Sequence, residues 1–171
     1  MKKYFFLILI GLLTRNSYSQ ENTRQVVPKN VIQLSLGSFV LVNSAHLSYD
    51  RLIATKEKGF FKSYYFTAKS GGNFTLDFSG SNSGTGLLTA IGVTGLTGKG
   101  KSHFEVGLGL GYFLDHRRND DNLEEGITPG DDSTFYPSIS IGYRKQSPKG
   151  FVFRTGLGAA EWFYIGFGYS F

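Results

Sequence analysis

The chain has no cysteine, one methionine, one tryptophan and four prolines among its 171 residues. The lack of cysteine excludes disulfide bonds, and it leaves no residue to carry a lipid anchor at a cleavage site. Beyond residue 13 there is no run of about 18 apolar residues, so a membrane-spanning helix is not expected there. No group of residues has the spacing of a metal site or a catalytic triad. We therefore expect no cofactor and no metal, and name no catalytic residue.

The first 19 residues have the organisation of a secretory signal peptide. Two lysines precede an apolar stretch over 4–13, which is too short to cross a bilayer as a helix. Small residues lead to the expected cut after Ser19. Residues 20–30 form a polar segment ahead of the main domain, 31–171. The sequence therefore predicts an exported protein with a single domain.

The formal net charge of +5 falls when the signal peptide is removed. Lys2, Lys3 and Arg15 leave with it and no acidic residue does, which takes the net charge to +2. The sequence pI of 9.4 therefore describes the uncleaved chain and does not indicate nucleic-acid binding. We expect no nucleic-acid partner.

Glycine and aromatic residues are abundant, and apolar residues alternate with polar or small ones at a period of two. This alternation predicts β-strands with two different faces. Eight segments show a strand-like pattern: 32–37, 46–53, 63–69, 85–97, 103–114, 138–144, 151–158 and 163–171. Segment 85–97 is apolar or small on both faces, so its sides stay unassigned.

The connections between these segments differ in length along the chain. Every second connection is short and turn-like: 54–59, 98–101 and 146–150. Among the others, 70–84 and 115–132 are long, whereas 38–43 and 158–161 are short. An outer-membrane barrel with both ends in the periplasm has short turns inside and longer loops outside. Closure leaves no unpaired strand edge in lipid, and about eight strands leave an interior that side chains can fill. We predict an all-β, eight-stranded antiparallel transmembrane up-and-down β-barrel with a filled lumen.

Three charged residues are predicted to point into this lumen near the short turns. Glu105, Arg144 and Arg154 lie on the inward faces of three consecutive segments. A buried charge without a partner is costly to desolvate. We therefore predict a lumen ion-pair cluster of these three residues, with Asp50 or His103 as possible further members. Its expected role is to plug and organise the interior rather than to conduct ions or bind a substrate.

Three other patterns suggest chemistry but have simpler explanations. His46 and Ser48 have the spacing seen in some lipid A deacylases, but the neighbouring segments carry no Glu or Asp, so lumen filling is favoured. The glycines of 107–111 lack the GxGxxG spacing and a following helix, and indicate a slim inner strand face. The acidic connection 115–132 matches no EF-hand loop, so we expect a solvated surface loop, with a calcium site as the alternative.

Several segments together resemble a known group of proteins. They are 47–53 (LSYDRLI), 98–109 (GKGKSHFEVGLG), 143–145 (YRK) and 164–171 (YIGFGYSF). From about Asn30 to its end, the chain resembles the small outer-membrane β-barrel proteins of Bacteroidetes-type bacteria. The resemblance implies a place in the cell outer membrane among its lipid and lipopolysaccharide, and insertion by the barrel-assembly machinery. Phe167, Tyr169 and Phe171 match the C-terminal signal that this machinery reads.

The residues favour a non-enzymatic integral outer-membrane protein with a structural or surface-interaction role. Two functional alternatives stay open, a narrow pore or passive channel and a lipid A-modifying barrel enzyme. A soluble secreted lipocalin-like barrel is the structural alternative. Five aromatic residues near strand ends are expected to form girdles at the membrane interfaces: Tyr64, Tyr112, Tyr143, Trp162 and Tyr169.

Overall fold

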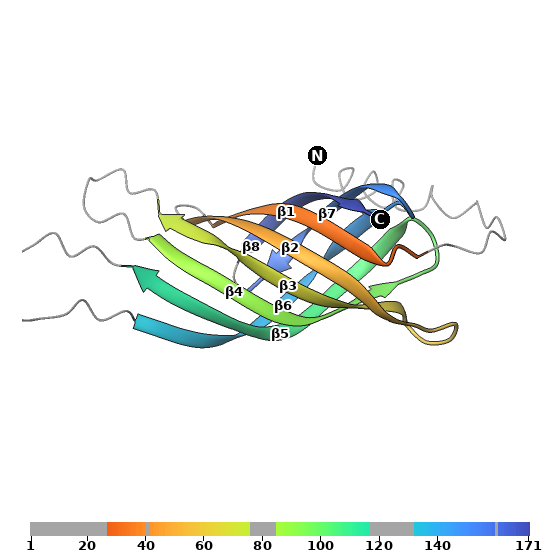
Figure 1. The fold of residues 1–171 in the computed structure, drawn as a ribbon, viewed down its shortest axis with the longest axis horizontal. Coiled ribbons are helices and arrows are strands. Elements are labelled where there is room, and N and C mark those ends of the chain that lie inside the picture. Colours follow the sequence, from red (N-terminus) through yellow and green to blue (C-terminus); the bar gives the residue numbers. More distant parts are fainter. Residues whose placement is uncertain (1–26, 40–41, 76–84, 117–131, 160) are drawn as a thin grey trace, which may run out of the picture.

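A computed structural model describes residues 27–39, 42–75, 85–116, 132–159 and 161–171. All regular structure within these ranges is β (Figure 1). The strands are β1 (Asn30–Phe39), β2 (Val42–Thr55), β3 (Phe61–Thr75), β4 (Thr85–Thr97), β5 (Ser102–His116), β6 (Asp132–Gln146), β7 (Gly150–Gly158) and β8 (Trp162–Ser170). The signal peptide expected at 1–19, and residues 20–26 of the polar segment, lie outside the described ranges.

The eight strands close into one barrel in sequence order. Each strand pairs antiparallel with the next, and β1 pairs with β8 from Val31↔Ser170 to Ser38↔Trp162. Two backbone hydrogen bonds between Asn30 and Phe171, of 3.0 and 2.9 Å, continue this closing seam. The predicted eight-stranded antiparallel barrel is confirmed as the fold.

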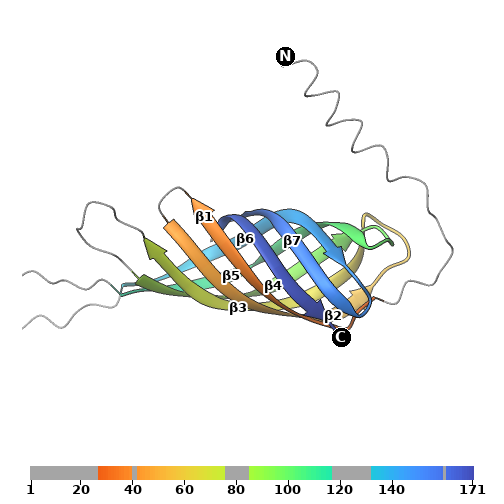
Figure 2. The same cartoon turned by 90° about the horizontal axis from the view of Figure 1, so that it is seen from above.

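Three short connections gather at one end of the barrel, together with the C-terminus (Figure 2). Each holds or adjoins a glycine with positive φ: Gly59 at 103°, Gly98 at 73° and Gly150 at 117°. Side-chain-bearing residues rarely adopt this conformation, so glycine permits the tight reversals here. We call this end the turn end and the opposite one the loop end.

Several strands extend further than the alternation predicts. The connection predicted at 70–84 is too long, because β3 continues to Thr75. Residues 70–73 read Ser-Gly-Gly-Asn and show no apolar face, yet their backbones pair with β2 on one side and β4 on the other. The connection predicted at 38–43 shrinks to 40–41 in the same way. Backbone pairing with two neighbours, rather than side-chain pattern, sets these strand ends.

The barrel also assigns the two faces of β4, which the sequence left open. Leu88 and Leu96 point inward and are buried, whereas Leu87, Ile91 and Val93 point outward and are exposed. The inward side is fixed by the register of β4 with β3 and β5. Hydropathy could not show this, because both faces of the segment are apolar or small.

The apolar part of the interior is small and lies at the turn end. Val31, Tyr65, Leu96 and Val152 form it, and Val27, from the end of the polar segment, packs against them. The interior beyond this cluster is mainly polar. Within the described ranges, no helix has the length and apolar character needed to cross a membrane.

Candidate functional site

The structure brings the three predicted lumen charges together above the apolar cluster. Glu105 on β5 pairs with Gly142 on β6, two residues before Arg144, and Arg144 lies directly opposite Arg154 on β7. Strand alternation therefore turns all three side chains inward. Glu105 and Arg144 are fully buried, and Arg154 is 5% exposed.

Glu105 is the centre of the network. Its Oε2 accepts a hydrogen bond from Arg144 Nε at 2.5 Å, and its Oε1 accepts one from Arg154 Nη2 at 2.5 Å. Arg144 Nη2 also donates to Asp50 Oδ2 of β2 at 2.7 Å. Two carboxylates thus balance two guanidiniums inside the barrel. Such balance is what makes buried charges tolerable in a low-dielectric interior.

Of the two further members named from the sequence, Asp50 joins the network directly. His103 also points inward, but its Nδ1 lies 2.6 Å from the carbonyl oxygen of Thr97, at the β4–β5 turn. This local contact holds the ring near the turn end.

Neutral polar side chains, which the sequence reasoning missed, complete the network. Tyr164 Oη donates to Glu105 Oε1 at 3.1 Å, and Gln33 Nε2 donates to Asp50 Oδ2 at 2.6 Å. Gln146 Nε2 donates to Tyr65 Oη at 2.9 Å, and Tyr65 Oη in turn donates to the carbonyl oxygen of Pro28 at 3.0 Å. Together with the charged residues, these groups come from every strand except β4. The network therefore ties almost the whole circumference across the lumen.

The two tyrosines also face the guanidiniums. Arg154 lies 4.6 Å from the centroid of the Tyr164 ring, and Arg144 lies 5.8 Å from that of Tyr65. Both distances are within the range of cation–π attraction. Glycines make room for this packing: a Cβ at Gly142 would lie only 2.6 Å from Tyr164 Oη. The glycines of the inner strand faces therefore leave the space that the large side chains of the network occupy.

A second ion pair, also missed from the sequence, lies closer to the loop end. Lys69 Nζ of β3 contacts both carboxylate oxygens of Glu161 at 3.0 Å. Glu161 precedes β8 and is 2% exposed. Its position in a short connection gave no sign that its side chain turns into the barrel.

His46 and Ser48 both face the lumen and are buried, as the alternation of β2 predicts. Neither ring nitrogen of His46 nor the hydroxyl of Ser48 has a hydrogen-bond partner among the described residues. A nucleophile needs a base within hydrogen-bond reach, and this pair shows no such contact. The described strands also hold no group of three or more His, Cys, Asp or Glu suited to a metal ion.

The glycines of 107–111 form a slim inner face. A Cβ at Gly109 would lie 2.2 Å from the carbonyl oxygen of Ile91, and one at Gly111 would overlap the Tyr136 ring. These glycines thus admit close strand approach and a tyrosine ring. The acidic connection lies mostly at 117–131, outside the described residues, and its predicted character stays a prediction.

Phe167, Tyr169 and Phe171 all lie on the outer surface, each about half exposed. Phe167 contacts the neighbouring rings of Phe151 and Phe153, with centroids 6.0 and 5.5 Å apart. Their assignment as an assembly signal stays a prediction.

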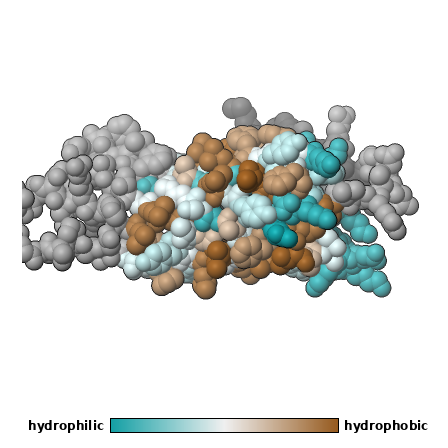
Figure 3. Space-filling view, viewed as in Figure 1, coloured by the Kyte–Doolittle hydropathy of each residue, from teal (hydrophilic) through white to brown (hydrophobic). Residues whose placement is uncertain are grey.

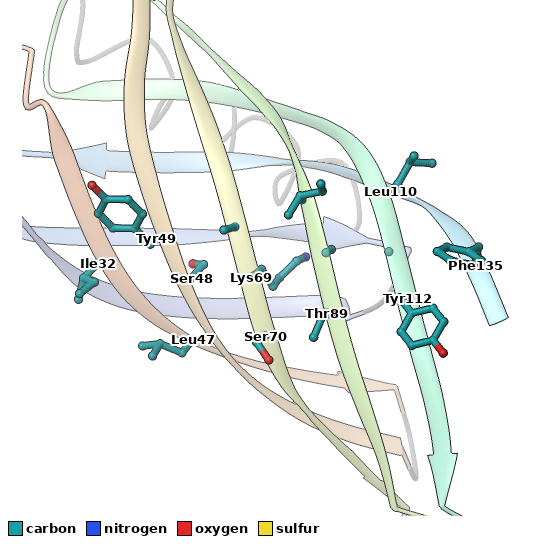
Figure 4. Close-up of a pocket in the computed structure, with 14 residues that line it drawn as sticks. Ile32, Leu47, Ser48, Tyr49, Lys69, Ser70, Thr89, Leu110, Tyr112 and Phe135 are labelled. Atoms are coloured by element: carbon teal, nitrogen blue, oxygen red, sulfur yellow. The ribbon is translucent and has the colours of Figure 1, made fainter. Parts of the chain in front are cut away.

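The outer surface around the lumen network is largely apolar, with hydrophilic residues towards the turn end (Figure 3). A hollow of about 610 Å³ opens on it across β1 to β6 (Figure 4). The small side chains of Ala68, Ser70 and Thr89 line it between the larger Leu47 and Tyr112. This hollow belongs to the outer apolar face and is separate from the charged network.

The chain matches no protein-family model, no curated protein and no solved structure. The description of the fold and of the lumen network therefore comes from the sequence and structure of this chain, and not from a similar protein.

Proposed function

We propose that this chain is an integral barrel of the bacterial outer membrane, without enzymatic activity, and with a structural or surface-interaction role. Its lumen is held closed by the network around Glu105. The loop end faces the exterior and the turn end faces the periplasm.

One observation carries the proposal: apolar side chains cover the outside of the barrel and polar side chains fill its inside. Among the described residues, 25 large hydrophobic side chains are exposed. The buried side chains comprise 15 that are polar or charged and only seven that are apolar. A soluble barrel has the opposite distribution, because apolar surface is unfavourable in water. Lipid removes this penalty, and closure pairs the backbone groups that lipid cannot satisfy.

Aromatic side chains near both ends of the outer surface support the same proposal. Phe104, Tyr143 and Tyr169 are exposed near the turn end, and Phe135 and Trp162 are exposed near the loop end. Membrane barrels carry aromatic girdles at both interfaces, where amphipathic rings meet the headgroups. The spacing of these two groups along the barrel agrees with an apolar belt between them.

Cell fractionation of the expressed protein tests the proposal. We expect the chain in the outer-membrane fraction, resistant to high salt and alkaline carbonate and released only by detergent. In detergent we expect a folded form that migrates differently on gels before and after heating. Release of folded protein into buffer without detergent would instead favour the soluble lipocalin-like barrel.

A narrow pore is the second candidate function, and the polar lumen favours it. Ser44, His46 and Ser48 line the lumen between the network and the loop end with polar atoms that have no protein partner among the described residues. Such groups are suited to contact with water. The network at the turn end distinguishes the two candidate functions. A pore requires the network to open so that ions can cross, whereas a structural barrel keeps it closed.

A further inference from the structure

Nine cationic side chains surround the turn end of the barrel. They come from the polar segment, from the ends of three strands and from all three short turns, so they encircle most of the rim. They are Lys29, Arg51, Lys56, Lys58, Lys62, Lys99, Lys101, Lys145 and Lys149. All are exposed except Lys62, which is half-buried. We call these residues the basic collar.

The basic collar has almost no opposite charge near it. Outside the lumen, Glu57 is the one acidic side chain that the described residues place at this end, and no collar residue forms an ion pair within the described ranges. Lys62 Nζ donates to the backbone oxygen of Glu57, and Lys56 lies over the ring of Tyr64. The cationic groups of the collar are therefore available to an external anion.

Two collar residues fix the depth at which that anion would lie. Arg51 and Lys145 are exposed on the outward faces of β2 and β6, in line with the apolar side chains of the belt. Lys145 follows the exposed Tyr143 on the same face. A cation on the lipid-facing side is unfavourable in hydrocarbon but tolerated at the interface. These residues therefore mark the level of the lipid headgroups, next to an aromatic girdle.

We propose that the basic collar binds the anionic headgroups of phospholipids, with phosphatidylglycerol as the representative, in the leaflet that the turn end meets. The proposal rests on the membrane placement proposed above. Ammonium and guanidinium groups form charge-assisted hydrogen bonds to phosphate oxygens. Each cation near an anionic lipid surface strengthens binding by a factor of about five.

The sequence of the connection between β5 and β6 differs from the collar in the sign of its charge. The connection 115–132 carries seven acidic residues against Arg117 and Arg118. On the proposal, anionic phospholipids favour the basic turn end. The collar would hold the barrel at a set depth and direction in the bilayer.

Lipid retention by the folded barrel tests the proposal. The full-length protein is folded into vesicles of phosphatidylcholine mixed with phosphatidylglycerol and then extracted in mild detergent, and native mass spectrometry counts each retained lipid. The test variant is K58Q/K99Q/K101Q/K149Q, which removes four exposed turn charges and leaves the strands intact. The matched control is K58R/K99R/K101R/K149R, which keeps the charge.

We expect the wild type and the arginine control to enrich phosphatidylglycerol over its share in the vesicle. We expect the glutamine variant to lose this enrichment by roughly tenfold or more, and high salt to weaken it in the wild type. Equal retention of both lipids by the wild type, or undiminished enrichment in the glutamine variant, overturns the proposal. An acidic protein as the true partner of the collar would give the first of these results.

The same experiment separates the two proposals. Heat-modifiable gel mobility reports whether the barrel folds into the vesicles. A barrel that inserts but shows no lipid preference contradicts the collar alone. A chain that stays soluble and folded outside the vesicles contradicts the membrane placement, and the collar proposal with it.

Discussion

Glu105 is the residue on which the interior depends most. It accepts hydrogen bonds from two guanidiniums and a tyrosine hydroxyl, and it is fully buried. Arg144 has a second carboxylate in Asp50, whereas the carboxylate that pairs with Arg154 is Glu105. Loss of the Glu105 charge would leave two buried cations facing one anion.

We therefore predict that Glu105→Gln destabilises the folded barrel by about 3–5 kcal/mol, because it removes one partner of a buried ion pair. Urea unfolding in detergent, followed by the fluorescence of the single tryptophan, measures the change. Glu57→Gln is the matched control, since Glu57 is exposed in a turn, and its effect should stay within about 0.5 kcal/mol. Equal stability of the two variants would show that the network does not stabilise the barrel.

Inner-face glycines are a second requirement at the residue scale. A Cβ at Gly109 would lie 2.2 Å from a backbone oxygen of β4, whereas the nearest atom to a Cβ at Gly72 is 3.8 Å away. We predict that Gly109→Ala lowers the unfolding free energy by about 1–3 kcal/mol or more through overpacking. Gly72→Ala, which points outward, should be close to neutral. The same urea titration compares them, and a neutral Gly109→Ala would contradict the tight inner face.

The site was partly predictable from the sequence at this scale. Alternation alone placed Glu105, Arg144 and Arg154 on inward faces, because a strand turns every second side chain to the same side. The contact of Arg144 with Asp50, 94 residues away in the sequence, depends on how the barrel closes. Tyr164 and Gln33 were missed for the same reason, since their partners lie on other strands. Glu161 lies in a connection, where alternation gives no direction.

At the scale of elements, β8 closes the barrel, and the predicted assembly signal follows β8 to Phe171, one residue beyond its end. Phe167, Tyr169 and Phe171 project outward, so they contribute little to the lumen. An exposed aromatic stripe on the closing strand is accessible to a partner during insertion. The signal can therefore be tested apart from the stability of the barrel.

We predict that Phe171→Ala reduces the amount of folded protein in the outer membrane several-fold in cells, while the purified variant folds into detergent like the wild type. Phe151→Ala is the control, because Phe151 is a similarly exposed outward aromatic residue, on β7 near the same end. Gel mobility before and after heating of the membrane fraction measures both. Equal losses for the two variants would count against a special role for the terminus.

The bounds of the strands show what apolar alternation predicts and what it misses. The apolar alternation of β5 predicted its position closely, at 103–114 against Ser102–His116. The last residues of β3 carry no such pattern and are held by their neighbours on both sides. Backbone hydrogen bonds between strands form whatever the side chains are. A strand can therefore continue where its residues show no apolar alternation.

At the scale of the whole molecule, the interior is filled by charge and the exterior is apolar. The network joins seven strands across the lumen at the turn end, and the ion pair of Lys69 and Glu161 lies nearer the loop end. Ions that cross the barrel must pass both. The closed interior favours a structural or surface-interaction role over conduction.

We predict no steady conductance for the wild-type protein in planar bilayers. The variant Glu105→Ala/Arg154→Ala removes one charge of each sign and leaves the Arg144–Asp50 pair in place. We expect this variant to fold and to show discrete channel openings, because the side chains that block the turn end are shortened. Steady conduction by the wild type at the level of the variant would refute the closed network and favour the narrow pore.

The sequence by itself determined the number of strands, most of their faces and the inward direction of the three lumen charges. Each of these follows from local alternation, which a strand imposes on its own residues. The tertiary structure decided the faces of β4, the full length of β3, the partner of Arg144 and the inward turn of Glu161. These depend on register and closure, which bring together residues far apart in the chain. No local pattern encodes which side chains meet across a lumen.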